Sequence, residues 1–315
     1  MKLQMALGFV MLLMVGCETL ESETQRIPWE RQHAYMKKVQ DPRIYGFSIY
    51  DTPSGPRIRG GARLHPERAV GLEMLAKEPF RPLVNLDGNH GEEWPVLLDF
   101  TSGATWLEFE LASELGARPV GERKATLVNL AEDDVPAALS IVSSLRLGQM
   151  FVEYPLVYTR MATGSLGAMN RDVSEGPVRA VIGWDILKKF DRIQFLYPIQ
   201  QVLLTTMKEE YVPNPERLVV TLPLVKDTGL CAVRGRMNGR EGNILIDPAG
   251  DFEVAADGAV SSLQLGEGFA LSDPVTAPSP GGVRIGARVL ENYQVTVCPK
   301  AGVIHFETPA ELEVE

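Results

Sequence analysis

Two short apolar runs that each end in aspartate, VLLD at residues 96–99 and ILID at residues 244–247, decide how this chain of 315 residues is organised. Each run follows a turn sequence, DGNHG or NGREG, and a strand-like segment precedes each turn. Apolar segments on both sides of such turns are typical of β-hairpins. Asp99 and Asp247 are therefore expected at the end of the second strand of a hairpin.

Two further landmarks recur in the same order after these aspartates. VSSLRLG at residues 142–148 matches VSSLQLG at residues 260–266 in six of seven positions. IGWDILKKF at residues 182–190 and IGARVLENY at residues 285–293 share the spacing of their glycine and apolar residues. Self-similarity of this kind indicates a duplicated structural unit.

The second copy of this unit is shorter than the first. Gly148 lies 49 positions after Asp99, whereas Gly266 lies 19 positions after Asp247. The other segments are rich in Val, Leu and Ile and are separated by Gly, Pro and Asn turns, which predicts a mainly β fold. Short helices are expected at residues 29–40, 107–115 and 184–190.

The N-terminus has the pattern of an export signal, with Lys2 followed by an apolar stretch too short to span a bilayer. Gly16 directly before Cys17 resembles the lipobox of bacterial lipoproteins, in which the cysteine is acylated and becomes the first residue. The resemblance implies a lipid anchor at Cys17, and Glu18 after it implies the outer membrane, facing the periplasm. An ordinary signal peptide with a coincidental cysteine is the alternative.

The order of landmarks along the chain resembles the retropepsin-like and pepsin-like aspartic peptidase superfamily. The spacing from Asp99 through Trp106 to LASELG at residues 111–116 matches that of the family without a gap. VIGWDIL at residues 181–187 is similar to the late glycine-containing helix start of that family. The likeness is good over about residues 80–206 and weaker over 218–307. It implies two tandem acid-protease barrel lobes, the second reduced, and a flap hairpin between Gly116 and Ser140.

This resemblance divides the chain into four parts. We expect a lipoprotein signal peptide at residues 1–16, a tether and lead-in at 17–60, a first aspartic-protease-like lobe at 61–210 and a second, shorter lobe at 211–315.

The chemistry of such a fold needs two carboxyl groups a few ångströms apart. Two like charges at that range cannot both ionise, so the pair shares a proton; one member activates water while the other protonates the scissile carbonyl. Asp99 and Asp247 are the candidate dyad, and because a coupled pair titrates as a unit, their roles stay unassigned. The alternative is that both carboxylates only cap turns.

The residues after both aspartates depart from the Asp-Thr-Gly or Asp-Ser-Gly motif of the family. Phe100 and Pro248 stand where the motif has a hydroxyl that braces the two loops, and Thr101 and Ala249 stand where it has glycine. We interpret these changes as weakened or lost proteolysis. The candidate loop residues are Phe100, Thr101, Ser102 and Gly103 in the first copy, and Pro248, Ala249 and Gly250 in the second.

Three functional hypotheses follow. The first is a cell-envelope lipoprotein, in effect a pseudoenzyme, whose cleft between the lobes binds an extended peptide or an envelope protein with weak or no proteolysis. The second is an active aspartic endopeptidase that uses Asp99, Asp247 and an activated water. The third is a structural lipoprotein, and a homodimer that pairs two first lobes also remains open.

Composition excludes several other classes of function. A net charge of −10, from 31 basic and 41 acidic residues, argues against nucleic acid as a partner. Neither a nucleotide-binding glycine motif, nor a serine-hydrolase elbow, nor a metal-ligand pattern occurs. We therefore expect no cofactor, no metal and no nucleotide, and membrane contact only through the lipid anchor.

Cys231 and Cys298 are the two cysteines outside the signal segment. In an exported protein they could form a disulfide that closes a long loop. Two buried free thiols are the alternative.

Overall fold

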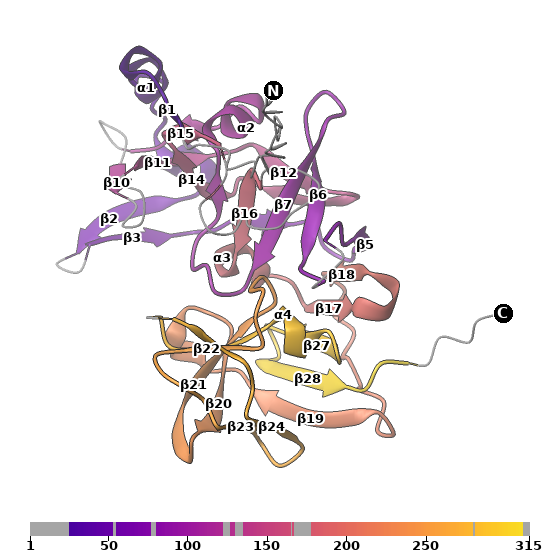
Figure 1. The fold of residues 1–315 in the computed structure, drawn as a ribbon. Coiled ribbons are helices and arrows are strands. Elements are labelled where there is room, and N and C mark those ends of the chain that lie inside the picture. The colour runs from indigo at the N-terminus through magenta and orange to yellow at the C-terminus, as the bar shows by residue number, and fades with distance from the viewer. Residues whose placement is uncertain are drawn as a thin grey trace, which may run out of the picture.

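A computed structural model describes residues 25–310 of the chain apart from residues 53–54, 77–79, 122–126, 130–134, 165, 167–177 and 280. The described part is mainly β, as the sequence predicts, and its strands form three large sheets (Figure 1). The earlier strands lie in the upper half of the view and the later ones in the lower half. None of the described helices has the length and apolar character needed to span a membrane.

The upper sheet contains eleven strands from the first copy. They run in the order β10 (Leu127–Asn129), β11 (Pro136–Ile141), β14 (Leu156–Arg160), β8 (Trp106–Leu107), β16 (Ala180–Gly183), β7 (Glu93–Asp99), β6 (Leu83–Asp87), β12 (Ser144–Leu147), β13 (Met150–Glu153) and β4 (Arg63–Leu64), with β9 (Arg118–Pro119) paired to β11.

The lower sheet contains seven strands from the second copy. They run in the order β24 (Phe269–Ser272), β23 (Ser262–Leu265), β20 (Ala232–Met237), β21 (Arg240–Asp247), β26 (Val283–Gly286), β22 (Val254–Ala256) and β25 (Thr276–Pro278).

A six-stranded sheet joins the two copies. Its order is β19 (Leu218–Pro223), β28 (Val303–Glu307), β27 (Gln294–Cys298), β17 (Arg192–Leu196), β18 (Gln201–Thr205) and β5 (Ala69–Glu73). The second copy contributes the first three strands and the first copy the last three. At its centre β17 pairs antiparallel with β27, and the side chain of Gln194 donates a buried hydrogen bond of 3.2 Å to Thr296 Oγ1.

The helices and the smaller sheets lie around this framework. The α-helices are α1 (Trp29–Met36), α2 (Phe109–Glu114), α3 (Trp184–Leu187) and α4 (Ala287–Leu290), and the 3-10 turns span Pro42–Tyr45, Tyr197–Ile199 and Lys226–Thr228. The two-stranded sheets pair β1 (Gln25–Arg26) with β15 (Ala162–Thr163), and β2 (Ser48–Thr52) with β3 (Gly55–Arg59). The expected helices all form, each shorter than its sequence pattern.

The duplication is visible in matching contacts. Gly148 and Gly266 both adopt positive φ in the turns after β12 and β23. A Cβ on either glycine would lie 3.0 Å from a valine methyl carbon, that of Val70 in β5 or Val220 in β19. Between β8 and β12 the first copy has four additional elements, which are α2, β9, β10 and β11. These elements account for its greater length.

The expected tether is wrong for the part of it that the structure describes. Ile27 and Tyr35 are buried in a cluster with Phe109 of the first copy, and the Tyr35 hydroxyl donates to Ser140 Oγ at 2.8 Å. Strand β1 also pairs with β15. This segment is charged overall, and its few apolar side chains are enough to fix it to the first sheet, so it belongs to the first lobe and is not a linker.

One glycine faces each aspartate and lets another backbone segment approach closely. Asp99 is paired with Gly183 across the parallel strands β7 and β16, and Asp247 is paired with Gly286 across β21 and β26. A Cβ on Gly183 would lie 2.8 Å from the carbonyl oxygen of Ser102, and one on Gly286 would lie 2.8 Å from that of Gly250. These are backbone atoms, so they cannot move aside as a flexible side chain would.

We expect Gly183→Ala and Gly286→Ala each to lower the free energy of unfolding by about 1–3 kcal/mol or more, because the added methyl group overpacks a backbone crossing. Urea denaturation measures the change. Gly242→Ala is the matched control, since nothing lies within 4 Å of its Cβ position. Equal effects at all three positions would contradict this account.

Candidate active site

Asp99 and Asp247 are the last residues of β7 and β21, as the hairpin pattern predicts. Each is the end of the second strand of a hairpin, β6 with β7 and β20 with β21. Each aspartate is only 3% exposed. The duplicated hairpin therefore brings two buried carboxyl groups to equivalent positions in the two copies.

The Asp99 carboxylate is held by its own loop. Its Oδ1 atom accepts hydrogen bonds from the backbone N–H of Thr101 at 2.7 Å, from the Thr101 hydroxyl at 2.8 Å and from the N–H of Ser102 at 3.1 Å. Three donors on one oxygen favour the ionised form. The hydroxyl beside Asp99 thus comes from Thr101, one residue later than the family motif would place it.

The Asp247 carboxylate has a cationic partner instead. Nη1 of Arg284 lies 3.5 Å from Asp247 Oδ2, and Nη2 of Arg284 donates to Ser279 Oγ at 2.9 Å. The sequence analysis missed Arg284 and Ser279. The sequence could have pointed to Arg284, because an arginine stands directly before the second IG landmark where the first copy has the apolar residue Val181.

The two aspartates influence each other's ionisation. Burial, followed by the negative charge of Asp99, raises the pKa of Asp247 from its ordinary 3.8 to about 7, against the opposing pull of Arg284. Burial likewise raises the pKa of Asp99, against its hydrogen bonds from Thr101 and Ser102 and the charge of Arg284. Repulsion between two buried carboxyl groups favours the state in which only one of them is ionised.

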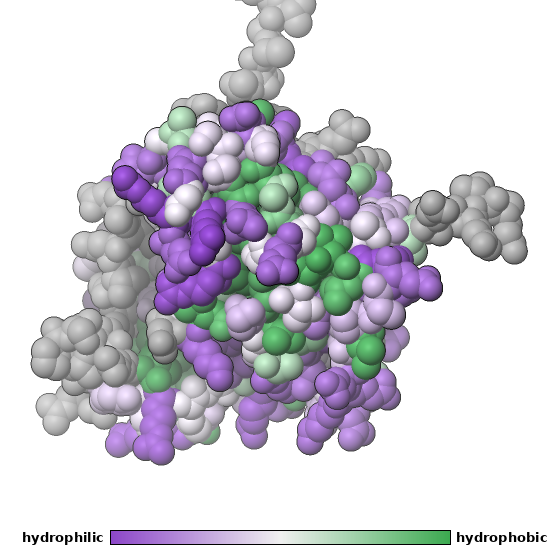
Figure 2. All heavy atoms as spheres, turned by 90° about the horizontal axis from the view of Figure 1, so that it is seen from below, coloured by the Kyte–Doolittle hydropathy of each residue, from purple (hydrophilic) through white to green (hydrophobic). Residues whose placement is uncertain are grey.

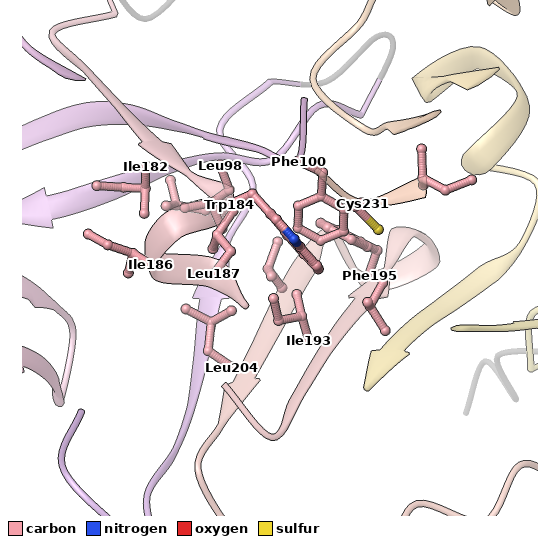
Figure 3. Packing of buried hydrophobic residues seen from close by; sticks show 14 of the residues in the cluster. Leu98, Phe100, Ile182, Trp184, Ile186, Leu187, Ile193, Phe195, Leu204 and Cys231 are labelled. Atoms are coloured by element: carbon pink, nitrogen blue, oxygen red, sulfur yellow. The ribbon is translucent and has the colours of Figure 1, made fainter. Parts of the chain in front are cut away.

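Phe100 explains how the loop after Asp99 manages without a bracing hydroxyl. Its buried ring lies 5.1 Å from the ring of Trp184 and 5.4 Å from that of Phe195, centroid to centroid (Figure 3). Its carbonyl oxygen accepts a hydrogen bond of 3.2 Å from the N–H of Cys231, in the second copy. The Phe100 ring therefore packs within the first copy, and the backbone hydrogen bond from Cys231 connects it to the second copy.

The loop after Asp247 is closely packed as well. Ala249 packs against an apolar cluster of the first copy that includes Leu97 and Val181. Gly250 lies against the ring of Phe252, where a Cβ would collide, and its N–H donates to the Asp247 carbonyl at 3.1 Å.

Three of the remaining loop positions surround these contacts. Pro248 is buried beside Asp247. Ser102 Oγ donates to the carbonyl of Ala104 at 2.6 Å, and a Cβ on the exposed Gly103 would lie 3.6 Å from Leu230 of the second copy.

The disulfide between Cys231 and Cys298 is not formed. Both cysteines are free and buried. The backbone of Cys231 bonds to Phe100 and Ile246, whereas Cys298 ends β27 opposite Val303 in the joining sheet. Each thiol is fixed by a different sheet, and burial raises the pKa of both. Cys17 lies outside the described residues.

Two surface hollows lie away from the aspartates, at equivalent turns of the two copies. One, of about 600 Å³, surrounds Gly266 and Arg234, and the other, of about 430 Å³, surrounds Gly148 and Arg68. Charged and apolar side chains are interspersed on the lower end of the molecule (Figure 2). Neither hollow is lined by Asp99 or Asp247. Within the described ranges, no group of three or more His, Cys, Asp or Glu could hold a metal ion.

Comparisons with protein-family models and with curated protein sequences found no match to this chain. The argument for its function therefore rests on the geometry of the aspartate pair.

The raised pKa values make stability depend on pH. Between pH 3.8 and about 7 the folded chain binds more protons than the unfolded chain, so the free energy of unfolding falls as the pH rises through this window. We expect urea denaturation to show this fall, and Asp247→Asn, which cannot ionise, to reduce it. Asp257→Asn, at an exposed aspartate, is the control. An equal fall in all three proteins would refute the assignment.

Proposed function

We propose that this chain is a cell-envelope lipoprotein with two tandem retropepsin-like lobes, and that it binds an extended peptide or envelope protein at the face around Asp99 and Asp247 with weak or no proteolysis. The observation that carries the proposal is the pair of buried, mutually repelling aspartates at equivalent hairpin ends. Paired carboxyl groups of this kind are the chemical core of aspartic peptidases.

The architecture supports the retropepsin-like assignment. Each copy has a hairpin that ends in aspartate, a strand parallel to it that ends in glycine, and a short helix directly after that glycine. The joining sheet takes three strands from each copy. An extended ligand can pair with strands in such a setting through its own backbone.

The loop residues support weak or absent cleavage. Phe100 is a buried core residue where the family motif has a hydroxyl, and Pro248 offers neither a hydroxyl nor an N–H to the loop. Both aspartates are nearly inaccessible, so water and a peptide bond reach them only if neighbouring side chains move.

A specific observation favours active endopeptidase as the second candidate. A pKa of about 7 for Asp247 keeps this carboxyl group protonated at mildly acidic pH, beside the second buried carboxyl group of Asp99. That combination provides one group to activate water and one to protonate the scissile carbonyl.

Peptide binding and cleavage can be measured together. The full chain in detergent is incubated with a mixed peptide library from pH 3 to 7, with products followed by mass spectrometry and retained peptides by size exclusion. We expect retained peptides and few products from the wild type. We expect Asp99→Asn and Asp247→Asn to change which peptides are retained, because each removes a buried carboxyl group that a peptide reaches once neighbouring side chains move.

The outcomes separate the candidates. Products that fall at least about 100-fold in both variants, the scale of losing an acid or base group, establish the peptidase and overturn the binding proposal. A well-folded wild type that neither retains nor cleaves peptides leaves the structural lipoprotein.

The lipid anchor is tested separately. We expect the chain to incorporate labelled palmitate in a bacterial host and Cys17→Ser to abolish this labelling, since acylation requires the thiol. Cys231→Ser is the control, because its thiol is buried in the fold. Labelling that survives Cys17→Ser, or a wild type without label, contradicts the anchor.

A further inference from the structure

The two copies differ at the residue two positions before the glycine that faces each aspartate. In β16 this residue is Val181, which is buried in an apolar cluster. In β26 it is Arg284, whose side chain is 28% exposed and reaches Asp247. Among the residues that the structure describes, a cation is therefore paired with only one of the two aspartates.

We propose that Arg284 is a positioning residue for the aspartate pair: it clamps the Asp247 carboxyl group from the side of Ser279 and so sets how readily Asp247 releases its proton. The inference rests on the proposed function only in taking the aspartate pair as the site.

The geometry of the guanidinium group supports a fixed clamp. Nη2 is anchored by Ser279 Oγ at 2.9 Å, while Nη1 faces Asp247 Oδ2 at 3.5 Å. A Cβ on Gly281 would lie 2.9 Å from Nη2, so the guanidinium packs against the backbone there. The planar fork of arginine holds its donors in fixed directions, which a flexible ammonium group does not.

Other charged groups near Asp247 are engaged elsewhere. Asp251 accepts from Arg288 Nε at 2.7 Å, and Glu253 accepts from the backbone N–H of Val275 at 2.8 Å. In the first copy, Asp185 accepts from the Thr105 hydroxyl at 2.9 Å. Asp99 and Arg284 are thus the charged groups that act on Asp247 among the described residues.

The two carboxyl groups are consequently unlike. Asp99 has three hydrogen-bond donors from Thr101 and Ser102, which stabilise its ionised form. Burial and the charge of Asp99 raise the pKa of Asp247, and the charge of Arg284 opposes them. Arg284 lowers the cost of ionising Asp247, so its removal makes the proton harder to release.

The test is an NMR titration of the Asp247 carboxyl carbon against pH. The full chain is labelled with ¹³C-aspartate and measured in detergent. The Asp247 signal is assigned as the one that Asp247→Asn removes. We expect Arg284→Val, which installs the residue of the first copy, to raise the titration midpoint by about one to three pH units, the effect of removing an adjacent opposite charge. Arg284→Lys should recover part of the shift. Arg288→Val, at an exposed pair with Asp251, should leave the midpoint unchanged.

An unchanged midpoint in Arg284→Val, or an equal shift in Arg288→Val, overturns the inference. If Arg284→Val does not fold, Ser279→Ala provides the second test: losing the anchor should shift the midpoint in the same direction by less, and no shift overturns the inference. Peptide binding is scored separately in the wild type. Its absence alongside a shifted midpoint would reject the proposed function and leave the role of Arg284 intact.

Discussion

The pairing of β17 with β27 is the constraint on which the rest of the structure depends. These antiparallel strands place Gln194 opposite Thr296 at the centre of a sheet that takes three strands from each copy. Because a slip of one residue would turn every side chain to the opposite face, this register fixes how the copies meet. The mutual effect of Asp99 and Asp247 on their ionisation follows from that meeting.

The sequence was informative where structure depends on local patterns. The apolar runs that end at Asp99 and Asp247 predicted the hairpins, and the repeated SSLxLG segments indicated the duplication that the matching turns at Gly148 and Gly266 show. It could not reveal what long-range packing decides. Phe100 became a core residue and Arg284 reached Asp247 only because strands distant in the chain lie together. The burial of Ile27 and Tyr35 was missed because their segment is charged overall.

The site stores unfavourable energy that the surrounding core has to offset. Burying two carboxyl groups side by side is costly unless one is protonated or paired, and both remedies are present at Asp247. The apolar contacts of Phe100 with Trp184 and Phe195 lie directly beside this pair. Favourable apolar packing thus lies next to two carboxyl groups that repel each other. Such an arrangement is typical of positions retained for chemistry or recognition and not for stability.

The hairpin of β10 and β11, present in the first copy and absent from the second, has a directional consequence. Two identical lobes would offer the same surroundings to a chain running in either direction between them. Here the lobes are unequal, and only one aspartate has an arginine beside it. A polypeptide bound between them, as we propose, would meet different neighbours when reversed, so that its amino-to-carboxyl sense would contribute to recognition.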